Sequence, residues 1–155
     1  NRLDYKPEII CTDFLNYDSD QKFDAILLDA PCSASGLIQK KPEILVSDKQ
    51  IDLKKLVNQQ KRLLEHSKKF IKKGGYIIYC VCSINNCEGY EQIKKFLKTN
   101  KNFSSVDHVD SIKKYGKIIY ENTLQIYPKR YKFSQNIDGY LDGFFISILK
   151  KEKNK

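Results

Sequence analysis

The sequence has 155 residues and contains no methionine, so no initiator residue is present. It also lacks a signal peptide and any apolar run near the ~20 residues that a membrane-spanning helix needs. We therefore expect a cytoplasmic fragment of a longer polypeptide with no membrane association. No internal repeat or inter-domain linker interrupts it, which predicts one unit over residues 1–150 and a basic tail over 151–155.

Paired cysteine motifs are missing as well. The five cysteines are Cys11, Cys32, Cys80, Cys82 and Cys87. They include no Cys-x-x-Cys pair and follow no framework spacing, which argues against a thiol redox protein and favours free thiols in a reducing compartment. Zinc sites normally use a two-residue gap and a second pair, and both histidines, His66 and His108, are distant in sequence, so we predict no metal site.

Acidic residues are in short supply, with 19 Asp and Glu against 28 Lys and Arg, a net charge of +9. Such a surplus favours an anionic partner, with nucleic acid first and an anionic membrane surface second. The lysines are spread along the chain, however, which fits equally well a lysine-rich source genome. The apolar fraction of 41% and aromatic fraction of 12% predict a globular fold.

Hydrophobic patterning predicts strands and helices that alternate over the first two thirds of the chain. The expected elements are a strand at 7–13, a strand at 23–28 covered on both faces, a helix at 48–72 ended by Gly74 and Gly75, a strand at 76–81 and a helix at 88–97. This order is typical of an α/β protein with a parallel sheet. Residues 122–127 and 143–149 are expected to form an antiparallel pair that closes the sheet edge, joined by a loop over 128–142.

Two of these strands are each followed by a cysteine. The first strand leads into Asp29-Ala30-Pro31-Cys32, and the second into Cys82. Ligands of open α/β sheets bind where parallel strands end and their loops begin. If the two strands are parallel neighbours, then Asp29, Cys32 and Cys82 share one crevice, and a carboxylate with two thiols suggests covalent chemistry.

The segment Asp29-Ala30-Pro31-Cys32-Ser33-x-x-Gly36, together with Cys82-Ser83, resembles the RNA (cytosine-5)-methyltransferases of the Sun (also called Fmu) family. The similarity extends over nearly the whole chain, including residues 41–44, 59–64, 74–75, 124–130 and 142–146. Within that family, the sequence is most similar to the bacterial enzymes that modify small-subunit (16S) ribosomal RNA.

This resemblance implies a Rossmann-like class I S-adenosylmethionine-dependent methyltransferase fold, of which residues 1–150 would be the C-terminal part of the catalytic domain. It implies that Cys82 attacks carbon 6 of cytosine, that Cys32 assists loss of the carbon-5 proton, and that Asp29 holds the base. Asp13, Asp29 and Pro31 would lie beside S-adenosylmethionine. The expected partner is RNA, with a monomeric protein favoured.

The sequence departs from the family pattern in three places. Cys80 and Val81 precede the second cysteine where small residues or threonine are usual, and Gly89 stands where the family commonly has asparagine. The glycine-rich loop and first strand that cradle the cofactor are not among these residues, so we expect the fragment alone to be inactive and to bind S-adenosylmethionine poorly.

Several alternatives stay open at this stage. The chain could be a non-catalytic RNA-binding remnant of the same fold. It could also belong to a DNA cytosine-5 methyltransferase, in which the nucleophile directly follows proline, as Cys32 does here. For the individual residues, Asp29 could simply cap its loop, and Cys32 could be a small buried hydrophobe.

Overall fold

The structure, a computed structural model, describes residues 6–46, 51–107, 110–134 and 137–153. Its strands are β1 (Phe23–Asp29), β2 (Ile71–Val81), β3 (Phe103–Val106), β4 (Lys117–Ile118), β5 (Leu124–Ile126), β6 (Lys129–Ser134), β7 (Ile137–Leu141) and β8 (Phe144–Lys151). Its helices are α1 (Glu43–Val46), α2 (Leu53–Ser67), α3 (Tyr90–Thr99) and α4 (Asp110–Lys113), with short 3₁₀ turns η1 (Phe14–Asn16) and η2 (Ser35–Leu37). None of the helices in these ranges is long and apolar enough to cross a membrane.

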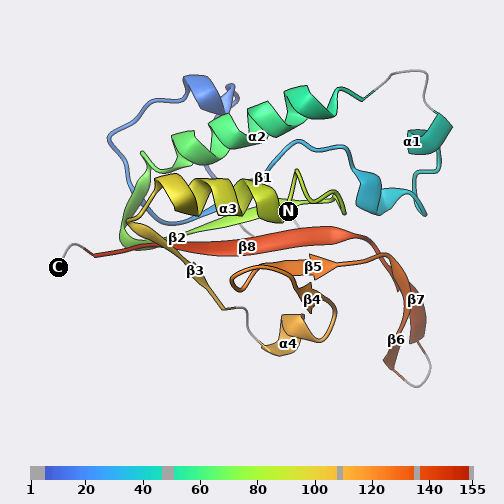
Figure 1. Ribbon diagram of the computed structural model, residues 1–155. Helices are drawn as coiled ribbons and strands as arrows, with labels where there is room; N and C mark the ends of the chain where they lie inside the picture. The colour runs from blue at the N-terminus through green and yellow to red at the C-terminus, as the bar shows by residue number, and fades with distance from the viewer. Residues whose placement is uncertain (1–5, 47–50, 108–109, 135–136, 154–155) are drawn as a thin grey trace.

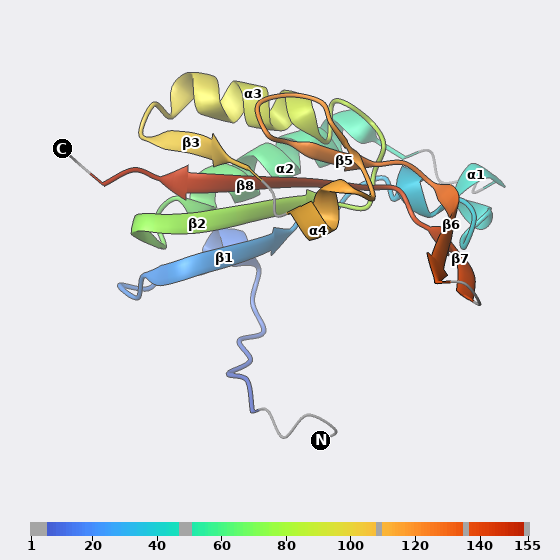
Figure 2. The same cartoon turned by 90° about the horizontal axis from the view of Figure 1, so that it is seen from below.

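Six strands form one mixed sheet in the order β1, β2, β8, β5, β4, with β3 also paired to β8. Strands β1 and β2 are parallel, whereas β8 runs antiparallel to β2, β3 and β5. The expected mixture of parallel strands with an antiparallel C-terminal pair is therefore confirmed. The pair does not close an edge, however, because β8 has neighbours on both sides and runs through the middle of the sheet (Figure 2).

Helices α2 and α3 lie together on one face of the sheet (Figure 1). Alternate residues of a strand point to opposite faces, so every second residue of β2 and β8 can enter the core beneath these helices. The buried cluster contains Ile77, Tyr79 and Val81 from β2, Phe145 and Leu149 from β8, Leu63 and Leu64 from α2, and Ile93 and Phe96 from α3. Burial of this apolar surface, at roughly 25 cal/mol per Å², is the main force that holds the helices on the sheet.

The opposite face is open along β1, which corrects the prediction of a strand covered on both faces. The Leu27 side chain is 70% exposed. Figure 2 looks onto this face and shows strands β1 and β2 uncovered by α2 or α3. A continuous apolar run does not reveal how many faces of its strand a neighbour covers, so the sequence could not make this distinction.

The predicted strand at 7–13 is wrong. Residues 6–12 adopt no helix or strand, and Ile9 is 83% exposed. Pro7 has no backbone N–H to donate, and among the described residues no strand lies alongside this segment, so its backbone has no ladder to join. Its last residue, Asp13, instead caps η1 by accepting a hydrogen bond from Leu15 N at 3.0 Å.

The helix predicted over 48–72 is confirmed over a shorter range, and its predicted glycine end is wrong. Helix α2 ends at Ser67, and Gly74 and Gly75 lie within β2. Gly74 has a φ of 81°, which favours glycine, and a Cβ on Gly75 would lie 2.7 Å from the carbonyl oxygen of Asp24. The two glycines permit an irregular start to the β1–β2 pairing rather than a helix end. Residues 47–50, at the start of the predicted helix, lie outside the described residues.

The loop predicted over 128–142 is wrong as well, because strands β6 and β7 form an antiparallel hairpin there. Its residues are polar and aromatic, and the hairpin packs as a separate two-stranded sheet, so hydrophobic alternation gave no signal. The other expected elements are confirmed: the strand at 76–81 within β2, the helix at 88–97 as α3, and β5 and β8 near the C-terminus. Strand β8 extends to Lys151, whose Nζ donates to the carbonyl of Ile71 at 3.0 Å.

Candidate active site

The two cysteine-bearing loops meet where β1 and β2 end. The parallel pairing sets Asp29 opposite Cys80. Beyond the last paired residues, Ala30 N donates to the carbonyl of Cys80 at 3.0 Å and Gly36 N donates to the carbonyl of Cys82 at 3.1 Å. These bonds hold the two loops side by side, and the sulfur atoms of Cys32 and Cys82 lie 3.2 Å apart.

Two glycines, Gly36 and Gly143, bring the loop that follows Cys32 into close contact with the residues before β8. Gly143 N donates to the carbonyl of Gly36 at 2.8 Å, and a Cβ on Gly36 would lie only 2.0 Å from the carbonyl oxygen of Gly143. No side chain fits between two backbones this close. Beside this contact Lys40 Nζ pairs with Asp142 at 2.6 Å, so the segment after Cys32 is tied to the start of β8.

Burial of Cys32 disfavours the charged, thiolate form of its side chain. Loss of solvent, followed by the hydrogen bond and the negative charge of Cys82, raises the pKa of Cys32 from 9.0 to about 12. The Cys32 thiol therefore keeps its proton at neutral pH. Since that S–H is adjacent to Cys82 Sγ, it can donate a hydrogen bond to a thiolate there.

Asp29 is an exposed residue at the end of β1. Its Oδ1 lies 3.8 Å from the sulfur of Cys80, which can donate a weak hydrogen bond to it. Burial, together with the charge of Asp29, raises the pKa of Cys80 to about 12, so Cys80 is a neutral thiol at this position. The structure thus places Asp29 at the same strand ends as the two cysteines, where its side chain contacts Cys80.

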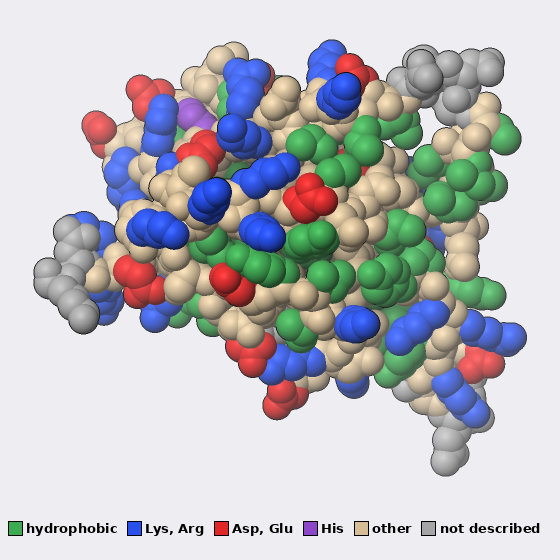
Figure 3. All heavy atoms as spheres, viewed as in Figure 1, with side chains coloured by type: hydrophobic (Ala, Val, Ile, Leu, Met, Phe, Trp, Pro, Cys, Tyr) green, Lys and Arg blue, Asp and Glu red, His purple; other side chains and the backbone are tan. Residues whose placement is uncertain are grey.

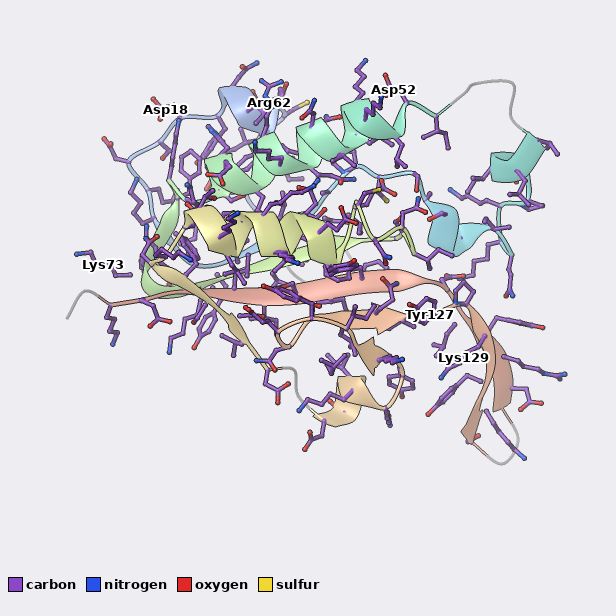
Figure 4. All side chains as sticks on the ribbon, in the orientation of Figure 1. Asp18, Asp52, Arg62, Lys73, Tyr127 and Lys129 are labelled. Carbon is purple, nitrogen blue, oxygen red and sulfur yellow. The ribbon has the colours of Figure 1, made fainter. Side chains whose placement is uncertain are left out.

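The remaining predicted cofactor residues lie apart from each other. The carbonyl of Pro31 accepts a hydrogen bond from Gln60 Nε2 at 2.9 Å, which fixes the loop directly before Cys32. Asp13 lies at a separate groove formed by η1 and the first half of α2, whose lining includes Asp52 and Arg62. Figure 4 shows Asp52 at the N-terminal end of α2 and Arg62 on the helix. Roles for Asp13 and Pro31 stay predictions.

Sequence reasoning overlooked one buried residue of this site. Glu88 is fully buried between the loops and accepts hydrogen bonds from Ser33, Ser83, Asn85 and Gln60. Burial opposes its ionisation, but these bonds together outweigh it and lower the pKa of Glu88. The sequence shows only a carboxylate six residues after Cys82. The groups that donate hydrogen bonds to it can be identified only from the fold.

Gly89, where the resemblance led us to expect asparagine, follows Glu88. It precedes α3 and provides no side-chain cap, as expected from its lack of a side chain. A Cβ at this position would lie 2.9 Å from the Phe145 ring. Glycine therefore lets the ring of Phe145 pack against the helix start.

The other cysteines play no part in the two-thiol contact. Cys11 is exposed, and Cys87 is half-buried with a pKa raised by burial and then by Glu88. Across the described ranges, no group of three or more His, Cys, Asp or Glu side chains is arranged to hold a metal ion.

A mixed sheet with parallel β1 and β2, an antiparallel β8 and the two cysteine-bearing loops at the strand ends has a Rossmann-like α/β architecture. The crystal structure of NSun6 from Pyrococcus horikoshii with SFG superposes with a TM-score of 0.73 at 23% identity, covering 95% of this chain and 35% of that one. This likeness shows the fold.

Sequence comparison gives the family. The model of the family described as 16S rRNA methyltransferase RsmB/F matches residues 1–150, and the chain belongs to that family. This confirms the resemblance predicted from the Asp29–Gly36 segment and Cys82.

Two relatives are named Ribosomal RNA small subunit methyltransferase B. The protein from Shewanella oneidensis is 43% identical over 100 residues, which are 63% of this chain and 23% of the relative. The one from Serratia proteamaculans is 35% identical over 132 residues, which are 85% of this chain and 27% of the relative. The chain therefore spans about a quarter of the length of these relatives.

Proposed function

We propose that this chain carries the two-thiol part of the active site of an S-adenosylmethionine-dependent RNA (cytosine-5)-methyltransferase that acts on small-subunit ribosomal RNA. The observation that carries the proposal is the 3.2 Å approach of Cys32 and Cys82 at the ends of parallel strands, in a chain that matches the RsmB/F family over residues 1–150. The relatives' names support the rRNA substrate, and the free thiols fit a reducing cytoplasm.

The cofactor assignment is supported by the neighbouring structure, which was solved with SFG, an analogue of S-adenosylmethionine. In this chain, the exposed carboxylate of Asp29 at the end of β1 fits such a group, because it is an acceptor at the strand ends where α/β folds bind ligands. Asp29, Pro31 and Asp13 would hold the cofactor, which supplies an electrophilic methyl group on a sulfonium sulfur.

Cys82 would act as the nucleophile. Its thiolate adds to carbon 6 of cytosine, forming the S–C6 bond, and the electron pair of the C5=C6 double bond then makes carbon 5 nucleophilic. The neutral Cys32 thiol, 3.2 Å away, donates to the attacking sulfur before the bond forms. Asp29 accepts hydrogen bonds from the amino edge of the base as charge develops. A base must leave its stack to expose carbon 6, so the target is flipped or unpaired.

Cys32 would act after methylation, and its ionisation is coupled to the state of Cys82. Two of the influences that raise the pKa of Cys32 are the hydrogen bond and the charge of Cys82. In the adduct, the Cys82 sulfur is a neutral thioether, so both influences fall away and Cys32 becomes a stronger acid. Once the Cys32 thiol has passed its proton to water, its thiolate can take the carbon-5 proton, while the S–C6 bond breaks, the C5=C6 double bond re-forms and Cys82 leaves as thiolate.

Two cysteine variants test this proposal in the gene product that contains this chain. Cys82→Ala should abolish methyl transfer to small-subunit rRNA, whereas Cys32→Ala should accumulate an RNA–protein adduct that survives a denaturing gel. The measurements are transfer of a labelled methyl group and the mobility of labelled RNA.

Each other outcome points to a different protein. An active Cys82→Ala enzyme would remove the central assignment. Exchanged phenotypes, with the adduct trapped in Cys82→Ala, would favour the order of residues used by DNA cytosine-5 methyltransferases. Absence of methyl transfer by the unmodified protein, with RNA binding retained, would favour the non-catalytic remnant.

A further inference from the structure

The most fully bonded side chain beside the two thiols is the carboxylate of Glu88, which is 0% exposed. It belongs to the turn between Cys82 and α3. The covalent chemistry proposed above assigns this carboxylate no step. A buried charge is costly unless its partners compensate for lost water, so its presence calls for a physical explanation.

Glu88 bonds to the residues that directly follow each cysteine. Its Oε1 accepts from Ser33 N at 2.8 Å, and its Oε2 accepts from Ser33 Oγ at 2.5 Å. Oε2 also accepts from Ser83 Oγ at 2.6 Å. Since Ser33 follows Cys32 and Ser83 follows Cys82, a single carboxylate ties the two loops together within one residue of each sulfur.

A second set of bonds fixes the loop before Cys32. Gln60 on α2 uses its Nε2 group twice, donating to Glu88 Oε1 at 3.0 Å and to the carbonyl of Pro31 at 2.9 Å. Asn85 Nδ2 adds a bond to Oε2 at 3.1 Å. Cys32 is thus held on both sides, through Pro31 and Ser33, by groups that all meet at Glu88.

These contacts favour an ionised acid. All five bonds to the carboxylate come from N–H or O–H donors, and only a deprotonated carboxylate accepts at both oxygens without a proton of its own. Hydrogen bonds to charged groups are about twice as strong as neutral ones, so these contacts can offset the cost of burial. The lowered pKa of Glu88, despite burial, agrees with this assignment.

We infer that Glu88 is a positioning residue that, through Ser33 and Ser83, holds the sulfurs of Cys32 and Cys82 at the separation needed for their joint chemistry. The inference rests on the proposed function for its catalytic meaning, but the geometry it describes can be measured independently of methyl transfer. A purely structural role would support the fold without setting the separation of the sulfurs.

The test measures how fast the two thiols form a disulfide with diamide. Both thiol hydrogens and two electrons pass to the N=N bond of the reagent, giving the Cys32–Cys82 disulfide and a hydrazine. Peptide mass spectrometry identifies the bond. Sulfurs 3.2 Å apart need to approach by only about 1 Å to reach the disulfide length of ~2.05 Å, so the unmodified protein should form it readily.

Glu88→Gln keeps the size of the side chain but removes its charge and one acceptor oxygen. At the Oε1 position the new NH₂ group would face two N–H donors, Ser33 N and Gln60 Nε2, and at the Oε2 position it would face the Asn85 Nδ2 donor. In either orientation at least one N–H group loses its acceptor, which loosens the link between the loops. A displacement near 1 Å at reacting atoms carries large rate penalties, so we expect disulfide formation to slow by about tenfold or more. An unchanged or faster rate in a folded Glu88→Gln protein would overturn the inference.

A matched serine pair keeps the test valid if Glu88→Gln fails to fold. Ser83→Ala removes the hydroxyl that bonds Glu88, whereas Ser67→Ala removes an equally buried hydroxyl that bonds the Leu63 carbonyl within α2. Ser83→Ala should slow the cross-link severalfold and Ser67→Ala should leave its rate unchanged, whatever each does to the melting temperature. Equal cross-linking rates in the two variants would contradict the inference. An active Cys82→Ala enzyme would contradict the proposed function but not this inference, because the cross-linking rate is measured without methyl transfer.

Discussion

At the scale of single residues, Cys32 and Cys82 should titrate as a coupled pair. Burial, together with the hydrogen bond to Cys82 and the charge of Cys82, raises the pKa of Cys32 to about 12. We therefore predict that Cys82→Ala lowers the pH at which iodoacetamide alkylates Cys32, measured by mass spectrometry of the Cys32 peptide. Alkylation of exposed Cys11 serves as the internal reference for reagent activity. An identical Cys32 profile in both proteins would show that burial alone sets it.

The raised thiol pKa values also predict a loss of stability in alkali. Cys32 and Cys80 both have a pKa of about 12 in the folded chain against 9.0 as the ordinary value. Between these values the unfolded chain releases protons that the folded chain retains. The stabilisation from the neutral thiols is complete below pH 9 and falls as the pH rises toward 12. Thermal unfolding from pH 8 to 11 should show this decline, and Cys80→Ala should make it shallower.

Gly36 offers a test of close backbone packing. A Cβ there would lie 2.0 Å from Gly143 O, so Gly36→Ala should destabilise the fold by about 1–3 kcal/mol through overpacking and displace the loop after Cys32. Urea unfolding measures the free energy of unfolding. Gly74→Ala provides the comparison, because a Cβ there meets the flexible Lys153 side chain and the cost comes from its positive φ.

Some of the residues at the site could be predicted from sequence and others could not. Cys32 and Cys82 were expected to meet because each follows a strand of parallel type, and the structure places their sulfurs in contact. Glu88 was missed because a buried carboxylate cannot be distinguished from a solvated one until its donors, which come from α2 and two loops, are located. Asp13 was expected at a strand end, and without a partner strand it caps a turn instead.

At the scale of elements, Tyr79 links strand β2 to the turn before α3. Its hydroxyl is buried and donates to the carbonyl of Glu88 at 2.6 Å. Tyr79→Phe should leave that carbonyl without its partner and reduce the free energy of unfolding by about 1–3 kcal/mol, as urea unfolding would measure. A cost near zero would mean that water or a neighbouring group replaces the hydroxyl.

The elements that the sequence predicted well have strong hydrophobic periodicity. Helices α2 and α3 and strands β2 and β8 each bury one regular stripe, so their patterns match their structures. None of the described side chains of the β6–β7 hairpin is buried. Gly74 and Gly75 fit a helix end as well as an irregular strand. In these places the local sequence pattern fits more than one secondary structure, and pairing with distant strands decides which one forms.

At the scale of the whole molecule, the net charge of +9 predicts RNA affinity that depends on salt. Figure 3 shows basic side chains over the α2–α3 face and over the β6–β7 hairpin. Lys129 lies at the hairpin end of the molecule and Lys73 at the opposite end (Figure 4). Since the hairpin directly precedes β8, whose start is tied to the Cys32 loop, its basic residues are the better candidates for RNA contact.

This placement yields a paired prediction. Lys129→Ala should weaken RNA binding and reduce the slope of log affinity against log salt by about 1, the effect of one lost phosphate contact. Lys73→Ala, which removes a charge that is also exposed but lies at the far end, should change neither quantity. Filter binding over a salt series measures both, and equal effects of the two variants would indicate attraction by net charge alone.

The position of β8 has a consequence for biosynthesis. This strand joins β2 to β3 and β5, yet it leaves the ribosome after every other strand that the structure describes. A nascent chain stalled before residue 144 would hold its earlier strands without the neighbour that connects them. Cys32 and Cys82 should therefore reach their final positions only once translation has passed this point. Protease resistance of chains stalled at successive positions should then appear in one step, after residue 144.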